Sequence, residues 1–248
     1  MLRISHLSKQ FDGLKVLDGF DLDVPRRSVA VLIGPSGCGK TTLFDLLTGV
    51  VPPDEGSLSW LGDPLPHLGR VSAYMQQKDL LLPWCSLMDN ALLPTKIAGA
   101  DPAAARDKAV QLFHRMDLAG FESYLPGDVS GGMRQRCALV RTLMFEHELV
   151  LLDEPLSALD YITRRSLHGL LLMLQQTFGK TLVMITHDIE EGLLLADDLY
   201  VLSRMPMRIL QHHRLETPKP RRSDDPMLIR VKTAVLARLD RELSHGAL

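Results

Sequence analysis

The residue pattern that most constrains this chain is a glycine-rich turn at residues 34–42, with the sequence GPSGCGKTT. Apolar runs at residues 29–33 and 43–47 flank the turn, which predicts a strand, a turn and a helix in succession. Glycines let several backbone N–H groups of such a turn point inward, and the helix N-terminus adds its positive end. The turn is therefore a predicted binding site for a nucleoside triphosphate.

Individual residues of this turn have predicted roles toward the nucleotide. Lys40 is expected to reach the β- and γ-phosphates, and the hydroxyl of Thr41 to coordinate Mg²⁺. Cys38 is either a thiol whose pKa the helix N-terminus lowers or a small filler of the loop, and we favour the filler. The predicted nucleotide-binding residues of the turn are Gly34, Pro35, Ser36, Gly37, Cys38, Gly39, Lys40, Thr41 and Thr42.

Carboxylates follow a later apolar run, residues 149–152, at Asp153 and Glu154. A continuous apolar run is typical of a parallel strand covered on both faces, and ligands bind beyond the carboxyl ends of such strands. Asp153 is predicted to hold Mg²⁺, and Glu154 to orient or deprotonate an attacking water. His187 follows another apolar run and is either a hydrogen-bond donor to the γ-phosphate or, as a histidine taken alone more often is, a structural or surface residue.

A second glycine turn opens a predicted helix with Ser130, Gly131 and Gly132. A helix N-terminus preceded by serine and glycine is another place where a phosphate can dock. The residues alone leave open whether the two turns serve the same nucleotide.

The remaining chain divides into regions of different pattern. Residues 1–28 alternate apolar and polar positions, which predicts antiparallel strands; Phe11 among them is either a core aromatic or a stacking partner for adenine. Residues 86–145 have helical periodicity and are expected to form an all-helical insertion. A polar linker after residue 217 leads to a short predicted helix at about residues 226–243.

Composition excludes several classes of protein. The 248 residues, 46% of them hydrophobic, suit one large α/β domain, and a net charge of −2 argues against a general polyanion-binding surface. No apolar stretch approaches the roughly 18 residues that spanning a bilayer requires, and the first residues lack a signal-peptide pattern. We therefore expect that no part of the chain crosses a membrane or is exported.

Together, these motifs resemble the ATP-binding subunit of an ABC (ATP-binding cassette) transporter over residues 1 to about 215. The similar motifs are Walker A at 34–41, the Q-loop at Gln76, the signature at 129–133, Walker B at 149–154, the D-loop at 157–160 and the switch histidine at His187. The signature departs from the usual LSGGQ at Val129 and Met133. Met133 removes a polar side chain, but the serine and both glycines remain.

This resemblance implies a fold and a division of the chain. The fold is α/β: a P-loop NTPase core with a mixed sheet, an antiparallel β subdomain and an inserted all-helical subdomain. Residues 1–217 would form the ATP-binding domain, with the helical subdomain at about 86–145, and residues 218–248 a C-terminal tail. In this family the signature turn completes the ATP site of the opposite subunit, which answers the question of the two turns.

The resemblance also assigns site residues. Glu154, His187 and Gln76 would be catalytic, and Thr41, Gln76 and Asp153 would hold the metal. Phe11 would stack on adenine. The remaining implied contacts, made with the partner's ATP or through the D-loop, are Ser130, Gly131, Gly132, Met133 and Asp160.

The implied function is a peripheral Mg²⁺-dependent ATPase on the cytoplasmic side of the membrane. It would power import of a small solute through separate permease subunits, together with a solute-binding protein. ATP and Mg²⁺ would be its cofactors, it would pair with a second copy as a homodimer, and it would bind no nucleic acid. Residues 74–84 are similar to the nitrate/sulfonate/taurine importer group, which includes carriers of thiamine-precursor pyrimidines. Leu81, Leu82 and Trp84 would contact the permease, or else pack the helical insertion internally.

Competing classes fit the sequence less well. Soluble ABC ATPases that act on ribosomes or nucleic acid usually carry two cassettes or a long coiled-coil insertion, and this chain shows neither. A GTPase or small-molecule kinase would need no signature turn or D-loop. An exporter half would need membrane helices of its own.

Overall fold

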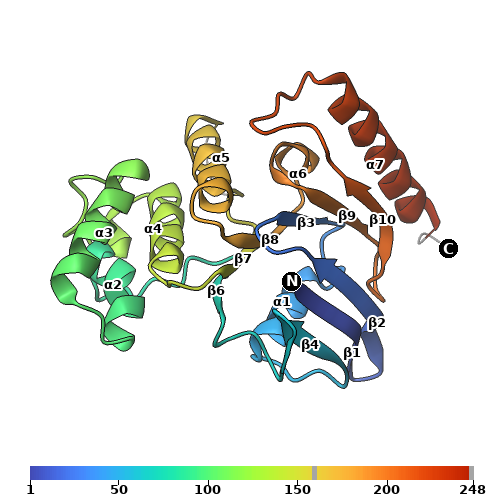
Figure 1. Ribbon diagram of the computed structural model, residues 1–248, viewed down its shortest axis with the longest axis horizontal. Coiled ribbons are helices and arrows are strands. Elements are labelled where there is room, and N and C mark those ends of the chain that lie inside the picture. The colour runs from blue at the N-terminus through green and yellow to red at the C-terminus, as the bar shows by residue number, and fades with distance from the viewer. Residues whose placement is uncertain (158–160, 246–248) are drawn as a thin grey trace.

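The computed structural model of the chain describes residues 1–157 and 161–245, and its strands form two sheets (Figure 1). One sheet has four strands in the order β2-β1-β4-β5, and the other has six in the order β10-β9-β3-β8-β7-β6. Helices α2, α3 and α4 form a group at the opposite end of the molecule from α7 (Figure 1). The predicted fold class, with its mixed sheet, antiparallel part and helical insertion, is confirmed.

The four-stranded sheet is antiparallel throughout. Its strands are β1 (Leu2–Phe11), β2 (Leu14–Val24), β4 (Glu55–Trp60) and β5 (Asp63–Leu65). The chain turns from β1 into β2 at Asp12 and Gly13, whose φ angles of 45° and 86° suit a tight hairpin. The alternating pattern of residues 1–28 thus predicted the hairpin correctly, whereas the short strand β5 was missed.

The six-stranded sheet is parallel except at one edge. Its strands are β3 (Val29–Ile33), β6 (Ser72–Met75), β7 (Leu149–Asp153), β8 (Thr181–Thr186), β9 (Asp198–Leu202) and β10 (Ile209–Arg214). Strand β10 pairs antiparallel with β9, which makes the sheet mixed. All residues of β3, β7, β8 and β9 are buried, as continuous apolar runs in a sheet covered on both faces require.

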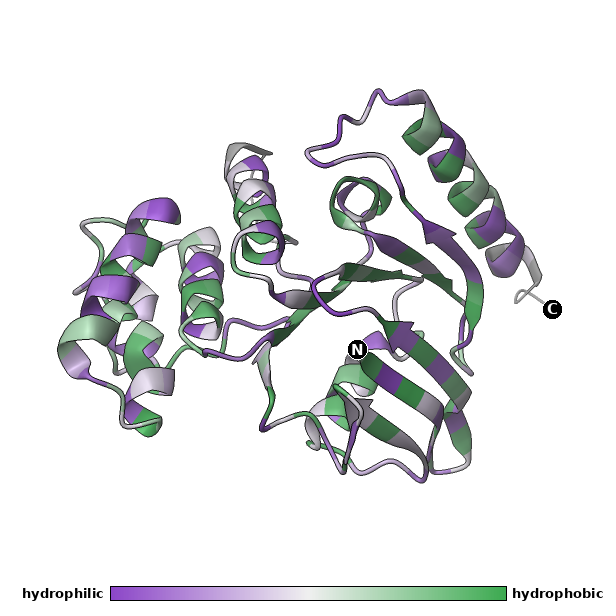
Figure 2. Cartoon of the chain, viewed as in Figure 1, coloured by the Kyte–Doolittle hydropathy of each residue, from purple (hydrophilic) through white to green (hydrophobic). Residues whose placement is uncertain are grey.

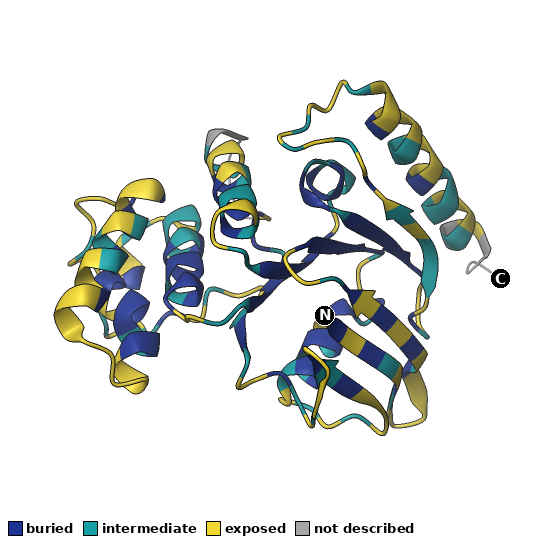
Figure 3. Cartoon of the chain, viewed as in Figure 1, coloured by how far each residue is buried: buried dark blue, intermediate teal, exposed yellow. Residues whose placement is uncertain are grey.

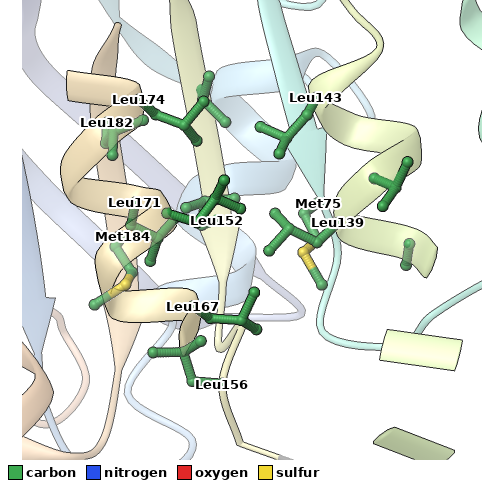
Figure 4. Packing of buried hydrophobic residues seen from close by; sticks show 14 of the residues in the cluster. Met75, Leu139, Leu143, Leu152, Leu156, Leu167, Leu171, Leu174, Leu182 and Met184 are labelled. Carbon is green, nitrogen blue, oxygen red and sulfur yellow. The ribbon is translucent and has the colours of Figure 1, made fainter. Parts of the chain in front are cut away.

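Two hydrophobic clusters lie on the two faces of this sheet. Ala30 and Leu32 of β3 face the cluster that contains helix α1 (Lys40–Thr48) and the four-stranded sheet. Val29, Val31 and Ile33 face the other cluster, to which helix α5 (Tyr161–Gln176) and helix α6 (Ile189–Leu195) belong. Figure 4 shows leucines of α5 lying against β7 and β8 in this second cluster. Apolar side chains therefore cover both faces of the six-stranded sheet.

The helical insertion consists of α2 (Leu87–Ile97), α3 (Pro102–Arg115) and α4 (Gly131–Leu143), with a short 3₁₀ turn at Pro126–Asp128 before α4. Asp101 caps α3 by accepting hydrogen bonds from the backbone N–H groups of Ala103 and Ala104, and Pro102 is the first helical residue, as predicted. Phe113 is fully buried among the three helices. The helices therefore carry their own apolar contacts and join the main core beside β6.

The chain ends in helix α7 (Pro226–His245), which packs against α6 and β10 (Figure 1). Leu228 and Val235 are buried in the core, while the exposed part of the helix mixes polar residues with the apolar Met227, Ile229 and Leu236 (Figures 2 and 3). None of the helices in the described residues is both long and apolar enough to span a bilayer.

Candidate nucleotide site

The glycine turn at residues 34–42 opens a cavity of about 370 Å³ beside the carboxyl ends of the parallel strands. The lining residues are Phe11, Val16, Ser36, Gly37, Gly39, Lys40, Thr41, Thr42, Gln77, Asp153, Glu154 and Met205. A larger cleft of about 710 Å³ lies between α5, α6 and the C-terminal linker. Charged side chains of that cleft pair with each other, as in Arg164 with Asp188 and Arg222 with Asp224, so we place the site at the glycine turn.

The backbone of the turn requires glycine at two positions. Gly39 has a φ of 104°, and a Cβ atom there would lie 2.6 Å from Cγ1 of Val16. A Cβ atom on Gly34 would lie 2.9 Å from Cβ of Leu202 and 3.2 Å from Sγ of Cys38. The turn is therefore packed closely against β2 and β9, and only glycine fits without displacing them.

Cys38 is the filler of this packing. Its side chain is buried, and burial raises the pKa of the thiol despite the nearby Lys40. The alternative of a lowered pKa at the helix N-terminus is wrong because desolvation of the thiolate outweighs the favourable charge.

Lys40 is held inside the turn itself. Its side chain is buried, and Nζ donates hydrogen bonds to the backbone oxygens of Gly34 at 2.8 Å and of Pro35 at 2.9 Å. These two acceptors fix the ammonium at the mouth of the α1 N-terminus, where positive charge from the helix also gathers. Both features favour an anion in the cavity.

Thr41 and Asp153 meet across the cavity. Oγ1 of Thr41 donates a hydrogen bond of 2.9 Å to Oδ2 of Asp153, the last residue of β7. Burial raises the pKa of Asp153 to about 6; the hydrogen bond from Thr41 opposes this shift and the charge of Glu154 adds to it. A buried carboxylate beside a hydroxyl supplies the hard oxygen donors that Mg²⁺ prefers. The described residues contain no group of three His, Cys, Asp or Glu side chains that could hold a metal ion.

Glu154 is the meeting point of three strand ends. Its φ of 48° bends the chain out of β7, and its backbone N–H donates to the oxygen of Ile185 at 2.9 Å. Oε2 accepts a hydrogen bond from Nε2 of Gln77 at 3.4 Å and lies 3.2 Å from Nδ1 of His187. The structure thus brings together two of the three predicted catalytic side chains, Glu154 and His187.

The glutamine at this position is Gln77, whereas the sequence pattern favoured Gln76. Both glutamines are exposed, but only Gln77 is among the described residues that line the cavity. Two adjacent glutamines follow β6, and the strand ends at Met75. One residue of register therefore decides which side chain points into the site, and the sequence held no signal for that choice.

Sequence reasoning also missed Val16 and Met205. Val16 lies in β2 against Gly39, and Met205 lies in the turn between β9 and β10. Phe11, which was predicted, lines the same cavity and is 41% exposed. No motif marks Val16 or Met205, because an apolar side chain beside a base needs only shape and position.

Comparison with known proteins identifies the family. The profile described as ABC transporter matches residues 17–157. This chain belongs to the ABC transporter family. The predicted membership and the predicted ATP-hydrolysing type of subunit are thereby confirmed.

Several relatives that are similar to this chain are all named TauB. The taurine import ATP-binding protein TauB of Escherichia coli (strain K12) is 37% identical over 247 residues, covering 96% of this chain and 97% of TauB. TauB of Shigella flexneri is also 37% identical, over 248 residues. These relatives agree with the predicted placement in the nitrate/sulfonate/taurine group.

Solved structures of ABC cassettes share the fold. A dimeric post-hydrolysis state of the cassette MJ0796 bound to ADP and Pi matches with a TM-score of 0.79 at 23% identity, covering 88% of this chain and 100% of that one. A nucleotide-free cassette from an ABC transporter matches with a TM-score of 0.76 at 23% identity, covering 94% and 98%.

The ABC signature turn is built but stands apart from the cavity. Oγ of Ser130 caps α4 by accepting a hydrogen bond of 3.3 Å from the backbone N–H of Met133. Ser130 and Gly131 are exposed, and Gly132 is partly exposed. None of the four predicted signature residues is among the described residues that line the nucleotide cavity. Asp160, the predicted D-loop residue, lies outside the described residues.

The three candidate contacts of the ABC permease differ in exposure. Trp84 is 74% exposed, Leu82 is partly buried, and Leu81 is only 8% exposed and belongs to the core. Leu81 thus packs internally, whereas Trp84 is presented to solvent. Leu80, at the start of the predicted contact region of residues 80–89, is half exposed.

Proposed function

We propose that this chain is the ATP-hydrolysing subunit of an importer, acting on the cytoplasmic face of a membrane through separate permease subunits. The observation that carries the proposal is the convergence of Glu154, His187 and Gln77 beside the Thr41–Asp153 pair in one cavity. The import direction is supported by the TauB relatives, whose name describes import of taurine. Taurine is therefore the first solute to test.

The residues of the cavity divide the reaction among them. The N–H groups of the turn and Lys40 would bind the phosphates, and Thr41, Asp153 and the amide oxygen of Gln77 would hold Mg²⁺. Mg²⁺ neutralises the charge that develops on the phosphates when it is bound. The pKa of Asp153, about 6, still leaves this carboxyl mostly ionised at pH 7, so it would offer the cation a carboxylate oxygen.

Glu154 is the proposed general base. Its carboxylate is mostly shielded from solvent, at 15% side-chain exposure, and Gln77 and His187 fix its orientation from two sides. An attacking water hydrogen-bonded to Glu154 would pass its proton to the carboxylate as the bond to the γ-phosphate forms. His187, which is exposed on one side, would hold the γ-phosphate.

The proposal includes a second copy of the chain and a permease. The residues of the signature turn do not line this chain's own cavity, and two chains placed head to tail would bring each turn to the other's ATP. Trp84 would contact the permease, and a solute-binding protein would deliver the solute. The alternative of a soluble ATPase on ribosomes or nucleic acid has no support from the TauB relatives.

Affinity purification of the tagged chain from gently solubilised membranes tests this function. A multi-span membrane protein should co-purify in stoichiometric amount, and the variant Trp84→Ala should recover several-fold less of it while binding ATP normally. Ile97→Ala is a matched control, because Ile97 is 85% exposed on α2 outside the predicted contact. Recovery with ribosomes or nucleic acid alone would overturn the transport function and leave the ATPase.

A further inference from the structure

The lining of the nucleotide cavity is chemically mixed. It combines the polar side chains of Gln77, Asp153 and Glu154 with the apolar side chains of Phe11, Val16 and Met205. Phosphates and a cation suit the polar side chains, and a purine ring suits the apolar ones. Met205 is 40% exposed, which leaves its thioether accessible to a ligand.

The turn that carries Met205 is fastened to β2. The backbone N–H of Met207 donates to the oxygen of Val16 at 2.8 Å, and the guanidinium of Arg208 lies 3.2 Å from Oδ2 of Asp18. Oγ of Ser203 accepts a hydrogen bond of 2.8 Å from the N–H of Arg208 and donates to the oxygen of Pro206 at 3.0 Å. These contacts hold Met205 beside Val16, and therefore beside the P-loop.

The C-terminal helix reaches the same turn. Oε1 of Glu242, near the end of α7, accepts a hydrogen bond of 3.4 Å from the backbone N–H of Arg204. Glu242 also lies 3.9 Å from Arg238, one helical turn earlier. The helix itself is anchored by the buried Leu228 and Val235, and it runs beside β10 (Figure 1). A helix packed against the core thus contacts Arg204, the residue next to Met205.

We propose that Met205 contacts the base of the bound nucleotide together with Phe11, and that Glu242 of α7 positions Met205 for this contact. A thioether packs favourably against the edge or face of an aromatic ring, and a purine is such a ring. The inference rests on the proposed binding of ATP in this cavity. It gives the tail, residues 218–248, a role within the nucleotide site.

The first test compares Met205→Ala with the wild type by equilibrium binding of ATP, ADP and inorganic tripolyphosphate. Loss of the contact should weaken ATP and ADP about five-fold each, because both carry the same base. Tripolyphosphate, which has no base, should bind as tightly as before. In steady state, KM for ATP should rise by more than kcat changes. Met227→Ala is the matched control, since Met227 is exposed on α7.

The second test separates positioning from folding. Glu242→Ala removes the acceptor for the N–H of Arg204 and should weaken ATP and ADP about two- to three-fold. Glu242→Gln keeps an acceptor oxygen at the same place and should restore wild-type affinity. Unfolding midpoints of both variants show whether α7 has stayed docked.

The outcomes separate the two proposals. If the wild type binds tripolyphosphate but neither ATP nor ADP, the proposed function falls, and the role of Met205 with it. If the wild type binds ATP and Met205→Ala does so equally well, or if tripolyphosphate is weakened by the same factor as ATP, the role of Met205 alone is overturned. Equal affinities of Glu242→Ala and Glu242→Gln would refute the positioning role of Glu242.

Discussion

The two glycine turns of this chain differ in how much of their surroundings the chain itself supplies. Around the P-loop, side chains from four segments converge, with Thr41 bonded to Asp153 and Glu154 in contact with Gln77 and His187. At the signature turn, Ser130 caps its own helix and faces solvent. The first turn belongs to a site that one folded chain assembles, whereas the second is exposed and does not line that site.

This difference follows from where each turn lies in the fold. Parallel pairing places the ends of β7 and β8 side by side. Glu154 and His187, which directly follow these strands, therefore lie close enough for their side chains to contact each other. The signature turn begins α4 in the helical insertion, whose buried side faces α2, α3 and β6. Only its outer end is left for a ligand.

The largest effect is expected at the P-loop site, which one folded chain assembles by itself and which we call the assembled half. Glu154→Gln keeps the shape and the contacts of the side chain but removes the proton acceptor, so ATP turnover should fall about a thousand-fold. ATP binding should remain within a factor of two or so. Single-turnover kinetics and equilibrium binding on the same preparations would measure both quantities.

Glu216→Gln provides the control, because Glu216 is exposed and lies outside the cavity. It should hydrolyse ATP at the wild-type rate. Normal turnover in Glu154→Gln would remove Glu154 from the role of base and leave the assembled half without one.

Sequence reasoning predicted this assembled half well because its determinants are local. Glycine turns and the carboxylates after an apolar run are fixed by spacing along the chain, so Lys40, Thr41, Asp153 and Glu154 were found in place. Gln77 and Met205 were not found. Their positions depend on where β6 ends and on how the β9–β10 turn packs against β2, which are tertiary facts.

The fold shows the same division. The strand–turn–helix at the P-loop, the hairpin of residues 1–28 and the helical insertion carry strong periodic patterns and were predicted correctly. Strand β5 has three residues and includes Pro64, and so gave no pattern to recognise. The contact of Glu242 with Arg204 joins residues 38 apart through a single backbone group, and no sequence pattern marks it.

A second prediction concerns the stability that the folded protein loses when the buried Asp153 is ionised. Asp153→Asn should raise the free energy of unfolding of the nucleotide-free protein by about 3 kcal/mol above pH 7. The native pKa of Asp153, about 6, exceeds the value of 3.8 for an exposed carboxyl, so the native state loses stability as the pH rises from about 4 to 6. Asparagine cannot ionise and still accepts the hydrogen bond from Thr41.

Urea unfolding at pH 5 and pH 8 would measure this difference. The advantage of the asparagine variant should be roughly half as large at pH 5 as at pH 8. The variant should also hydrolyse ATP poorly, since it has lost the proposed magnesium ligand. If the asparagine variant is no more stable than the wild type at pH 8, the ionised Asp153 does not lower the free energy of unfolding.

A third prediction tests whether the signature turn serves another chain. Gly131→Asp places a carboxylate at the outer end of α4, and a side chain fits there because the nearest atom would lie 3.5 Å from its Cβ. Repulsion of the partner's phosphates should lower turnover about thirty-fold. Lys40→Ala should also be inactive, by loss of a phosphate ligand in its own cavity.

Mixing these two impaired variants tests whether the P-loop of one chain works with the signature turn of another. A mixed dimer contains one site with an intact P-loop and an intact signature turn, so activity should return to about a quarter of the wild-type rate. Gly127→Asp serves as the control, since Gly127 also has open space around it and lies before the helix. If the mixture stays inactive, each chain uses its own signature turn, and the contrast between the two halves disappears.

The smallest effect expected decides which glutamine belongs to the assembled half. Gln77→Ala removes a contact to Glu154 and the proposed ligand to Mg²⁺, so kcat should fall about ten-fold and the magnesium concentration for half-maximal rate should rise. Gln76→Ala is the neighbouring control and should leave both values unchanged, because Gln76 is exposed and outside the cavity. Both variants change a surface loop, so folding should be equal. The reverse result, with Gln76→Ala impaired and Gln77→Ala normal, would show that the loop after β6 shifts by one residue when nucleotide binds. The P-loop site would then reach its final arrangement only when nucleotide binds. Like the signature turn, it would depend on another molecule, so the two turns would differ less than the contacts of the nucleotide-free chain indicate.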